Sequence, residues 1–338
     1  MTKNEMLKLL SENECVIDVH THVGIAVEEY LTGAYPYGMS FEDLILRMKL
    51  LGISHSVVFP FPSSYYLREK MNIPDTGSEV SFSDFPYENE NTRLFEEIYS
   101  VFPEYSDMAL PFVMFDPSVK VDEQVEHLEK IIAEYPVYGM KAVTTYCKSF
   151  VSDFDGKGSA LKEFARKHNL PVLFHSSWLK DDIWANISDI IKIAENNPDL
   201  RICGAHMARF SAEALERAAG LPNCFIDTAA LKIHCDMALM NNEAIPPDGK
   251  GRFETDYNSP GKVLNDLAAA YPDTLIWGSD APFYYYFKIF GYTEPFEFKL
   301  KANYDSEVLA LNALDTARKR RISYENTLKF LFGNNLSF

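Results

Sequence analysis

An aspartate and two histidines alternate along one short segment near the N-terminus, in the run VIDVHTH at residues 16–22. Successive side chains of a β-strand point to opposite faces, so a strand here predicts that Asp18, His20 and His22 share one face. Two neutral imidazoles on one face can share a divalent transition metal ion. The alternative is a buried strand whose histidines only form hydrogen bonds. A His-x-His pair behind an aspartate, at the end of an apolar run, favours the metal site.

Polar side chains also stand at the ends of later apolar runs. Lys141 lies near the end of VYGMKAV, His175 ends PVLFH, His206 ends LRICGAH, and Asp280 follows TLIWGS. Taken singly, each has an ordinary explanation, since a histidine can finish a strand and an aspartate can cap the next helix. Four of the eight histidines of the chain stand at such ends, however. We therefore expect these side chains to meet at one site.

Two further histidines carry a weaker signal. His55 falls inside an apolar run and is expected to be a core residue with satisfied hydrogen bonds. His234 follows the seventh apolar run, and it is expected either to reach a substrate or to lie on the surface.

The rest of the chain supplies elements that would bring these ends together. Short β-branched or apolar runs alternate with amphipathic segments, which predicts parallel strands with helical crossovers. We place eight strands at residues 15–20, 53–59, 108–114, 137–143, 171–175, 200–206, 224–228 and 274–279. We place helices at residues 41–51, 121–135, 159–168, 182–196 and 260–271, where apolar residues recur at spacings of three and four. Eight such units predict an α/β fold of the (β/α)8 TIM-barrel type, in which the strand ends gather at one rim.

The length of 338 residues suits one such barrel, and we expect a single domain over residues 1–338. Two connections exceed the usual unit, at about residues 61–91 after the second strand and 229–259 after the seventh. Both would lie at the C-terminal rim, where barrel active sites are built, so we expect them to be lids. The alternative is that they are insertions without a role at the site, or that they form contacts between subunits of a homo-oligomer.

Composition narrows the class of protein. The formal net charge of −17, from 49 acidic and 32 basic side chains, argues against a nucleic-acid partner, because phosphate backbones are bound by basic surfaces. The N-terminal segment is polar and no run reaches the length of a membrane span, so we expect a cytoplasmic protein without a membrane partner. The five cysteines are odd in number and lie mostly in or beside apolar runs, which predicts buried, reduced thiols.

The motifs VIDVHTH, GMKAV, PVLFHSS, ICGAHMAR and WGSDAP occur in this order, and ENTLKFLFGNN follows them near the C-terminus. Over nearly its whole length the sequence resembles the amidohydrolase superfamily, and more narrowly the amidohydrolase-2 group of metal-dependent hydrolases, which includes aminocarboxymuconate semialdehyde decarboxylase. The resemblance implies that His20, His22, His175 and Asp280 bind one divalent ion, usually zinc. Manganese is the alternative. It also implies that His206 is a catalytic or substrate-polarising residue beside the ion.

The expected chemistry is metal-assisted hydrolysis of a small carboxylate, lactone, ester or amide. Three imidazoles and one carboxylate leave the ion a net positive charge and room for a water, whose pKa can fall to about 7. Asp280 would take the proton as general base, while His206 donates to the developing oxyanion. Asp18 would lie one layer deeper and orient the ligands.

Lys141 leaves the number of metal ions open. In two-metal members of the superfamily a lysine at this strand end becomes carboxylated and bridges the ions. The alternative is a lysine that binds an anionic substrate. Members whose eighth-strand and C-terminal motifs are similar to those of this chain mostly use one metal ion, so we expect one ion and disfavour a second.

The same ion and aspartate would also support a lyase reaction, the nonoxidative decarboxylation of an aromatic or muconate-type acid. A decarboxylase needs a cation for the departing carboxylate. The candidates are Arg209, three residues after His206, and Arg68 or Arg93 near the first long connection, with an ordinary surface arginine as the alternative. Aromatic walls would suit a planar small-molecule substrate, although these rings would equally pack helices against the barrel. The candidate rings are Tyr65, Tyr66, Phe82, Phe85, Tyr87, Trp178, Phe283, Tyr284, Tyr285, Tyr286 and Phe287.

Overall fold

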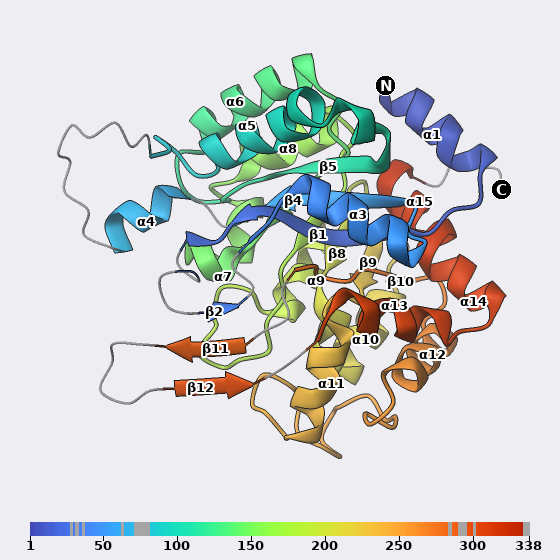
Figure 1. Cartoon of the computed structure of the whole chain (residues 1–338). Coiled ribbons are helices and arrows are strands. Elements are labelled where there is room, and N and C mark those ends of the chain that lie inside the picture. Colours follow the sequence, from blue (N-terminus) through green and yellow to red (C-terminus); the bar gives the residue numbers. More distant parts are fainter. Residues whose placement is uncertain are drawn as a thin grey trace.

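The computed structural model describes residues 1–27, 30, 34–35, 38–61, 64–70, 82–282, 286–289, 296–299 and 302–333. Helices surround a central sheet (Figure 1). The strands are β1 (Ile17–Ile25), β2 (Ala34–Tyr35), β3 (Gly38–Met39), β4 (His55–Pro60), β5 (Ala109–Met114), β6 (Gly139–Ala142), β7 (Val172–Phe174), β8 (Ile202–Gly204), β9 (Cys224–Asp227), β10 (Leu275–Ile276), β11 (Tyr286–Ile289) and β12 (Phe296–Lys299). The helices are α1 (Lys3–Glu12), α3 (Phe41–Leu51), α4 (Ser64–Lys70), α5 (Glu88–Glu96), α6 (Val121–Glu134), α7 (Thr144–Cys147), α8 (Ser159–Lys167), α9 (Ile187–Asn196), α10 (Ala212–Ala219), α11 (Leu231–Leu239), α12 (Pro260–Ala270), α13 (Tyr304–Asn312), α14 (Thr316–Arg320) and α15 (Asn326–Phe332).

The central sheet is nine-stranded, curled and mostly parallel. Its order is β10-β9-β8-β7-β6-β5-β4-β1-β3, and only the short β3 runs antiparallel to its neighbour. Backbone hydrogen bonds join β1 to the segment after β10. The Val19 N–H donates to the Trp277 carbonyl at 3.1 Å, and the His22 N–H donates to the Ala281 carbonyl at 2.7 Å. The two edges of the sheet therefore meet, in agreement with the predicted barrel, and each of the eight predicted runs contains a parallel strand.

Two predicted boundaries differ from the structure by five residues, for local reasons. β1 continues five residues past its predicted end at His20, because its last residues pair with β3 through the partners Gly24 with Met39 and Ile25 with Gly38. The helix predicted from residue 182 begins only at Ile187, because the side chain of Asn186 caps it by accepting from the Ser188 N–H at 2.9 Å.

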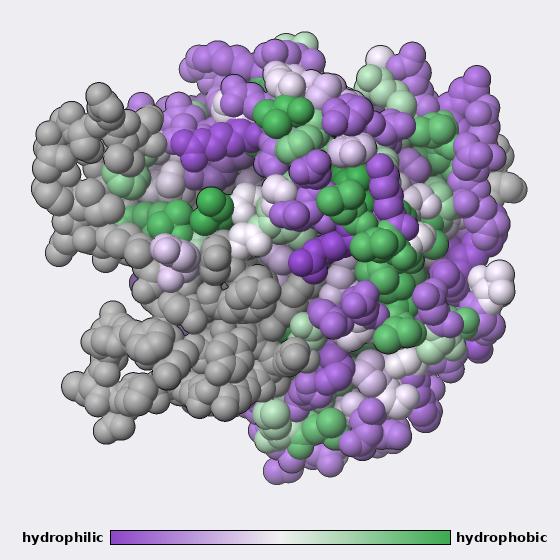
Figure 2. Space-filling model, viewed as in Figure 1, coloured by the Kyte–Doolittle hydropathy of each residue, from purple (hydrophilic) through white to green (hydrophobic). Residues whose placement is uncertain are grey.

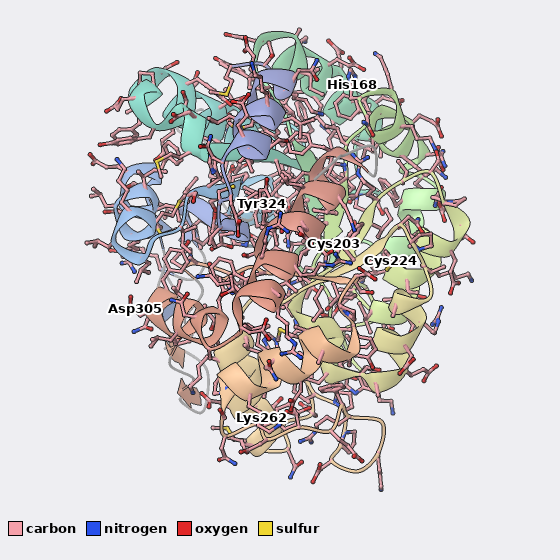
Figure 3. All side chains as sticks on the ribbon, turned by 90° about the vertical axis from the view of Figure 1, so that its right-hand side faces the viewer. His168, Cys203, Cys224, Lys262, Asp305 and Tyr324 are labelled. Atoms are coloured by element: carbon pink, nitrogen blue, oxygen red, sulfur yellow. The ribbon has the colours of Figure 1, made fainter. Side chains whose placement is uncertain are left out.

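Buried apolar side chains lie on both faces of the sheet. On β4, Val57 and Phe59 pack inside the barrel, whereas Val58 between them packs with the surrounding helices. The interior cluster continues to α1 and α15, and the hydroxyl of Tyr324, just before α15, donates to the Leu10 carbonyl of α1 at 2.9 Å. Figure 3 views this end of the molecule, with Tyr324 near the middle of the helices that cover it.

The opposite end of the barrel carries the long connections. β11 and β12 form an antiparallel hairpin that also pairs with β2, and it lies on the far side of the molecule from α1 (Figure 1). The sequence analysis did not predict this hairpin. The first predicted insertion contains α4 and the start of α5, and the second contains α11. Of the predicted aromatic run, residues 283–285 lie outside the described residues, and the side chains of residues 286–287 are not described.

The described surface is mixed in character. Figure 2 shows hydrophilic residues over most of one face and hydrophobic patches over α3 and α13, where Leu50 and Leu309 are exposed. Within the described part of the chain, no helix is long and apolar enough to cross a membrane. The five cysteines are buried thiols outside any disulfide, as predicted, and Figure 3 shows Cys203 and Cys224 on neighbouring strands.

Candidate functional site

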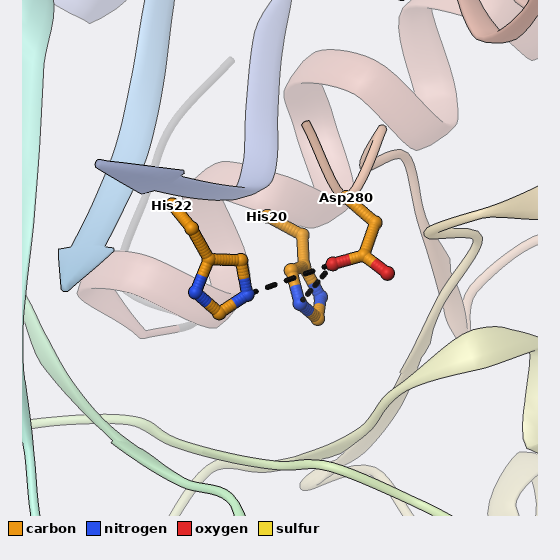
Figure 4. A group of neighbouring side chains, drawn as sticks. All are labelled: His20, His22 and Asp280. Carbon is orange, nitrogen blue, oxygen red and sulfur yellow. Dashed lines mark ion pairs between the residues drawn. The ribbon is translucent and has the colours of Figure 1, made fainter. Parts of the chain in front are cut away.

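His20, His22 and Asp280 come together at the C-terminal ends of the barrel strands (Figure 4). One ligand atom from each residue lies within 4.8 Å of the others, and all three side chains are buried. The Oδ1 atom of Asp280 is 3.2 Å from Nε2 of His20 and 3.6 Å from Nε2 of His22. Two imidazole nitrogens and one carboxylate oxygen thus converge on one point, which is a donor set suited to zinc or a similar ion.

The second nitrogen of each imidazole already faces an acceptor. Nδ1 of His20 lies 2.8 Å from the Asp227 carboxylate, and Nδ1 of His22 lies 3.2 Å from the Pro60 carbonyl. Each Nδ1 therefore donates a proton, which directs the Nε2 of each ring toward Asp280. A metal-binding histidine is normally held in this way by an acceptor behind it. The residues present fit a divalent ion.

A bulge in β1 decides which residues share this site. Asp18 pairs with Ser56 of β4, but His22 pairs with Phe59, so β1 carries one extra residue between them. The extra residue reverses the alternation, and Asp18 therefore lies on the opposite face from His22. The prediction that Asp18, His20 and His22 share one face was wrong for Asp18, because a strict period of two does not allow for a bulge.

Asp18 instead joins the two edges of the barrel. Its fully buried carboxylate accepts the backbone N–H groups of His20 and Ser279, each at 3.0 Å. Gly278 next to it lets the edges approach, since a Cβ there would lie 2.8 Å from the Cβ of His20. Asp280 follows with a φ of 66°, a conformation that aspartate tolerates better than most residues.

Lys141 lies in the same buried space, on β6. Its Nζ is 3.3 Å from Nε2 of His20 and 4.8 Å from the centre of the Phe59 ring. The structure therefore brings Lys141 to the histidines, as the sequence predicted.

His175 and His206 form a second group beside the first. Nδ1 of His175 lies 3.0 Å from Nε2 of His206, and Nδ1 of His206 lies 3.1 Å from the Ala229 carbonyl and 3.9 Å from Oδ2 of Asp280. His175 is not part of the three-residue group found within 4.8 Å. Three of the four predicted metal ligands are thus gathered at one point, and the fourth lies against His206.

A left-handed turn after β8 positions Arg209. The five residues His206–Phe210 all have positive φ, between 49° and 64°. Such a conformation costs roughly 1–2 kcal/mol for each residue with a side chain, so the surroundings must hold it. The Phe253 N–H donates to the Phe210 carbonyl at 2.8 Å, and Nε of Arg209 donates to the Ser176 carbonyl at 2.8 Å. Arg209 is therefore buried beside the site and not a surface arginine.

Asp227 escaped the sequence analysis, and His234 lies closer to the site than its weak signal indicated. Asp227 ends β9 fully buried, and it accepts from His20 through Oδ2 and from the His206 and Ala229 N–H groups through Oδ1. His234 lies in α11, buried and stacked on His206 with the ring centres 5.2 Å apart, so a surface position was wrong. The available signals were the carboxylate at the end of CFIDT and the spacing of three between Leu231 and His234.

Comparison with known proteins assigns the chain to a family. The sequence pattern of the amidohydrolase family matches residues 83–333, about three quarters of the chain. The chain belongs to the amidohydrolase family. The match includes Lys141, His175, His206 and Asp280, whereas His20 and His22 precede it. No curated protein matches the chain by sequence.

The amidohydrolase fold also appears in the solved structures that this chain resembles. A candidate 2-pyrone-4,6-dicarboxylic acid hydrolase from Pseudomonas putida has a TM-score of 0.55 and 15% identity, covering 96% of this chain and 100% of that one. A zinc-bound amidohydrolase from Burkholderia multivorans has a TM-score of 0.58 and 13% identity, with coverages of 94% and 99%. A 2,6-dihydroxybenzoate decarboxylase from Rhizobium has a TM-score of 0.57 and 12% identity, with the same coverages. At these identities the likeness concerns the fold.

Burial and charge set the protonation of this amidohydrolase site. Burial lowers the pKa of His22 to about 4 and that of His175 well below its usual value. Burial and Lys141 act to lower the pKa of His20, but the carboxylates of Asp227 and Asp280 outweigh them and raise it. Burial acts to raise the pKa of Asp280, but the histidines around it hold that pKa well below its usual range.

Burial also shifts the pKa values of Lys141 and Asp18. Burial lowers the pKa of Lys141 to about 8, against the opposing effect of Asp227 and Asp280. Burial raises the pKa of Asp18 to about 6, although its hydrogen bonds act in the other direction. The positive charge of Lys141 is therefore stabilised by the carboxylates of Asp227 and Asp280.

Two of the predicted pocket aromatics serve the packing of the first insertion. The Tyr66 hydroxyl donates to the Asp116 carboxylate, and the fully buried Tyr87 contacts the Cys147 thiol at 3.2 Å through its hydroxyl. Trp178 packs against the main core cluster. These contacts favour a packing role for these three rings.

Proposed function

We propose that this amidohydrolase is a metal-dependent hydrolase that uses a metal-activated water on a small carboxylate, lactone, ester or amide. The observation that carries the proposal is the convergence of the Nε2 atoms of His20 and His22 on Asp280, with both Nδ1 atoms turned to acceptors. These three residues and His175 would hold one ion, zinc in the first place and manganese as the alternative. The zinc-bound Burkholderia neighbour supports this choice.

His175 would complete the ligand set through Nε2. Because Nδ1 of His206 faces a carbonyl, Nε2 of His206 is the acceptor, and Nδ1 of His175 must be the donor to it. We therefore propose that His206 orients His175. The donor role toward an oxyanion is the alternative. It requires a second proton on His206, whose pKa burial and Arg209 lower well below its usual value.

A bound ion would supply a water with a pKa near 7 and polarise the substrate carbonyl. Asp280 is the general base in this proposal, because its low pKa keeps it ionised at neutral pH and its carboxylate adjoins both ligand histidines. Having taken the proton of the attacking water, Asp280 would return it to the leaving group. Asp18 and Asp227 hold the backbone and the ring of His20 in place.

Lys141 and Arg209 supply positive charge for an anionic small-molecule substrate. Both are buried next to the ligand histidines, at 3.3 Å from His20 and His175 respectively. A second ion bridged by carboxylated Lys141 remains the less favoured alternative, since the amine already contacts His20. We also propose that the connections after β4 and β9 act as lids.

Nonoxidative decarboxylation is the second candidate. Arg209 gives it specific support, because its buried guanidinium lies beside the site and would donate to a substrate carboxylate. The dihydroxybenzoate decarboxylase neighbour supports the same reaction class.

An isotope experiment distinguishes the two reactions. The zinc-loaded chain is incubated in ¹⁸O-labelled water with a panel of lactones, esters, amides and carboxyl-labelled aromatic or muconate-type acids. Hydrolysis places one ¹⁸O in the product carboxylate, whereas decarboxylation releases labelled carbon dioxide and leaves the product without ¹⁸O. Asp280→Asn is the control for site-specific turnover. The proposal is contradicted if a chelator does not reduce turnover, or if no substrate of the panel is turned over.

A further inference from the structure

A continuous set of hydrogen bonds fixes the protons of the second histidine group. A carbonyl only accepts, so Nδ1 of His206 donates to Ala229 and leaves Nε2 with a lone pair. Nδ1 of His175 lies 3.0 Å from that lone pair and must donate to it. The remaining lone pair of His175 is then on Nε2, the atom through which it would bind an ion.

That lone pair already has a partner. Nη2 of Arg209 lies 3.3 Å from Nε2 of His175, and a guanidinium can only donate. On its other side, Nη1 of Arg209 lies 2.5 Å from Nε2 of His234, whose Nδ1 donates to the Ala230 carbonyl at 2.8 Å. Arg209 thus donates to both rings. Its position is set by the left-handed turn and by the Ser176 carbonyl.

One nitrogen lone pair cannot accept from a guanidinium and bind a metal ion at the same time. We propose that Arg209 is a positioning residue that competes with the metal ion for Nε2 of His175, so that full coordination requires Arg209 to release this nitrogen. The inference rests on the proposed metal-dependent function and adds a control step to the same site. The released Nη2 would then become the donor for a substrate carboxylate.

The competition predicts that removing Arg209 increases the affinity for zinc. A residue that helped to build the metal site would weaken zinc binding when removed, whereas Arg209→Met is expected to tighten it. The expected gain is roughly 10-fold to 150-fold, the range for one hydrogen bond to a charged group. Zinc affinity is measured by competition with a chromophoric chelator, which needs no substrate, and circular dichroism verifies folding. Arg252→Met is the matched control, since Arg252 is a buried arginine whose side chain donates to the Pro246 and Ala238 carbonyls.

A double-mutant cycle separates competition from simple charge repulsion. In a His175→Ala background the lone pair is absent, so Arg209→Met is expected to leave zinc affinity unchanged. If the gain persists there, the effect is electrostatic and the inference is overturned. Unchanged or weaker zinc binding by Arg209→Met in the otherwise wild-type chain overturns it as well. A wild-type chain that takes up no zinc would instead contradict the proposed function itself.

A crystal structure of the zinc-loaded wild type covers the case in which Arg209→Met does not fold. The expected result is zinc on Nε2 of His175, with Nη2 of Arg209 beyond hydrogen-bond distance from that atom. Zinc held by His20, His22 and Asp280 alone, with Arg209 still paired to His175, overturns the inference.

Discussion

Replacing Asp227 with asparagine tests how the site holds its first histidine. The carboxylate accepts three hydrogen bonds, from Nδ1 of His20 at 2.8 Å, from the His206 N–H at 2.8 Å and from the Ala229 N–H at 3.0 Å. Asparagine has the same shape but only one acceptor oxygen. If the amide nitrogen of the asparagine faces His20, the imidazole must carry its proton on Nε2, and it then loses the lone pair that faces Asp280. With its nitrogen toward the backbone, two buried N–H groups face a donor.

The expected loss of metal affinity follows from these bonds. A hydrogen bond to a charged group contributes about 1.5–3 kcal/mol, which corresponds to roughly 10-fold to 150-fold in a binding constant. Loss of the residue behind a metal-binding histidine typically weakens binding about 10-fold to 100-fold. We therefore expect Asp227→Asn to weaken zinc binding by about 30-fold, within the overlap of the two ranges.

Isothermal titration of the metal-free chain with zinc measures this effect, and thermal melting verifies that the variant folds. Asp236→Asn is the matched control, since this carboxylate lies on α11 and pairs with Lys232. Its zinc affinity is expected to equal that of the wild type. A folded Asp227→Asn chain that binds zinc as tightly as the wild type would refute the role assigned to Asp227.

Three further predictions concern turnover, metal number and pH. Asp280→Asn is expected to reduce turnover by several orders of magnitude while the melting temperature shows a folded chain; activity close to that of the wild type would remove Asp280 from its role. Lys141→Ala is expected to leave metal content near one ion per chain and to raise KM for an anionic substrate; a fall from about two ions, with activity restored by short carboxylic acids, would indicate a carboxylated bridge. Burial lowers the pKa of His55 from 6.5 to about 4, with Asp107 acting in the opposite direction, so below pH 6.5 the unfolded chain takes up a proton that the folded chain refuses. The associated stability is present above pH 6.5 and is lost as the pH falls toward 4. Between pH 7 and pH 5 the free energy of unfolding, measured with urea, is therefore expected to fall by about 2 kcal/mol more in the wild type than in His55→Gln. Equal losses in the two chains would contradict this.

The hydrogen bonding of His55 could not be predicted from the periodicity of the sequence. The sequence placed it correctly in a strand, at the start of β4, but the expectation of satisfied hydrogen bonds was wrong for Nδ1. Among the described residues, no group forms a hydrogen bond with that buried atom. Strand placement depends on the local pattern, whereas hydrogen-bond partners depend on which distant residues pack nearby.

The barrel and the convergence of polar strand ends could be predicted for a related reason. Parallel strands that alternate with helices place all their C-terminal ends at one rim, so His20, Lys141, His206 and Asp280 meet whatever the details of packing. The bulge in β1 could not be predicted, because one inserted residue leaves no mark in a run as short as VIDVHTH. The left-handed turn that carries Arg209 contains no glycine, the usual signal for positive φ.

Metal content is the most direct test of the central claim, that His20, His22, His175 and Asp280 hold one catalytic divalent ion. The wild-type chain is purified without chelators and its metals are counted by elemental analysis, before and after incubation with zinc or manganese. The account predicts about one ion per chain, lost in His20→Ala. A wild-type chain that contains no ion and takes up neither metal would contradict the account.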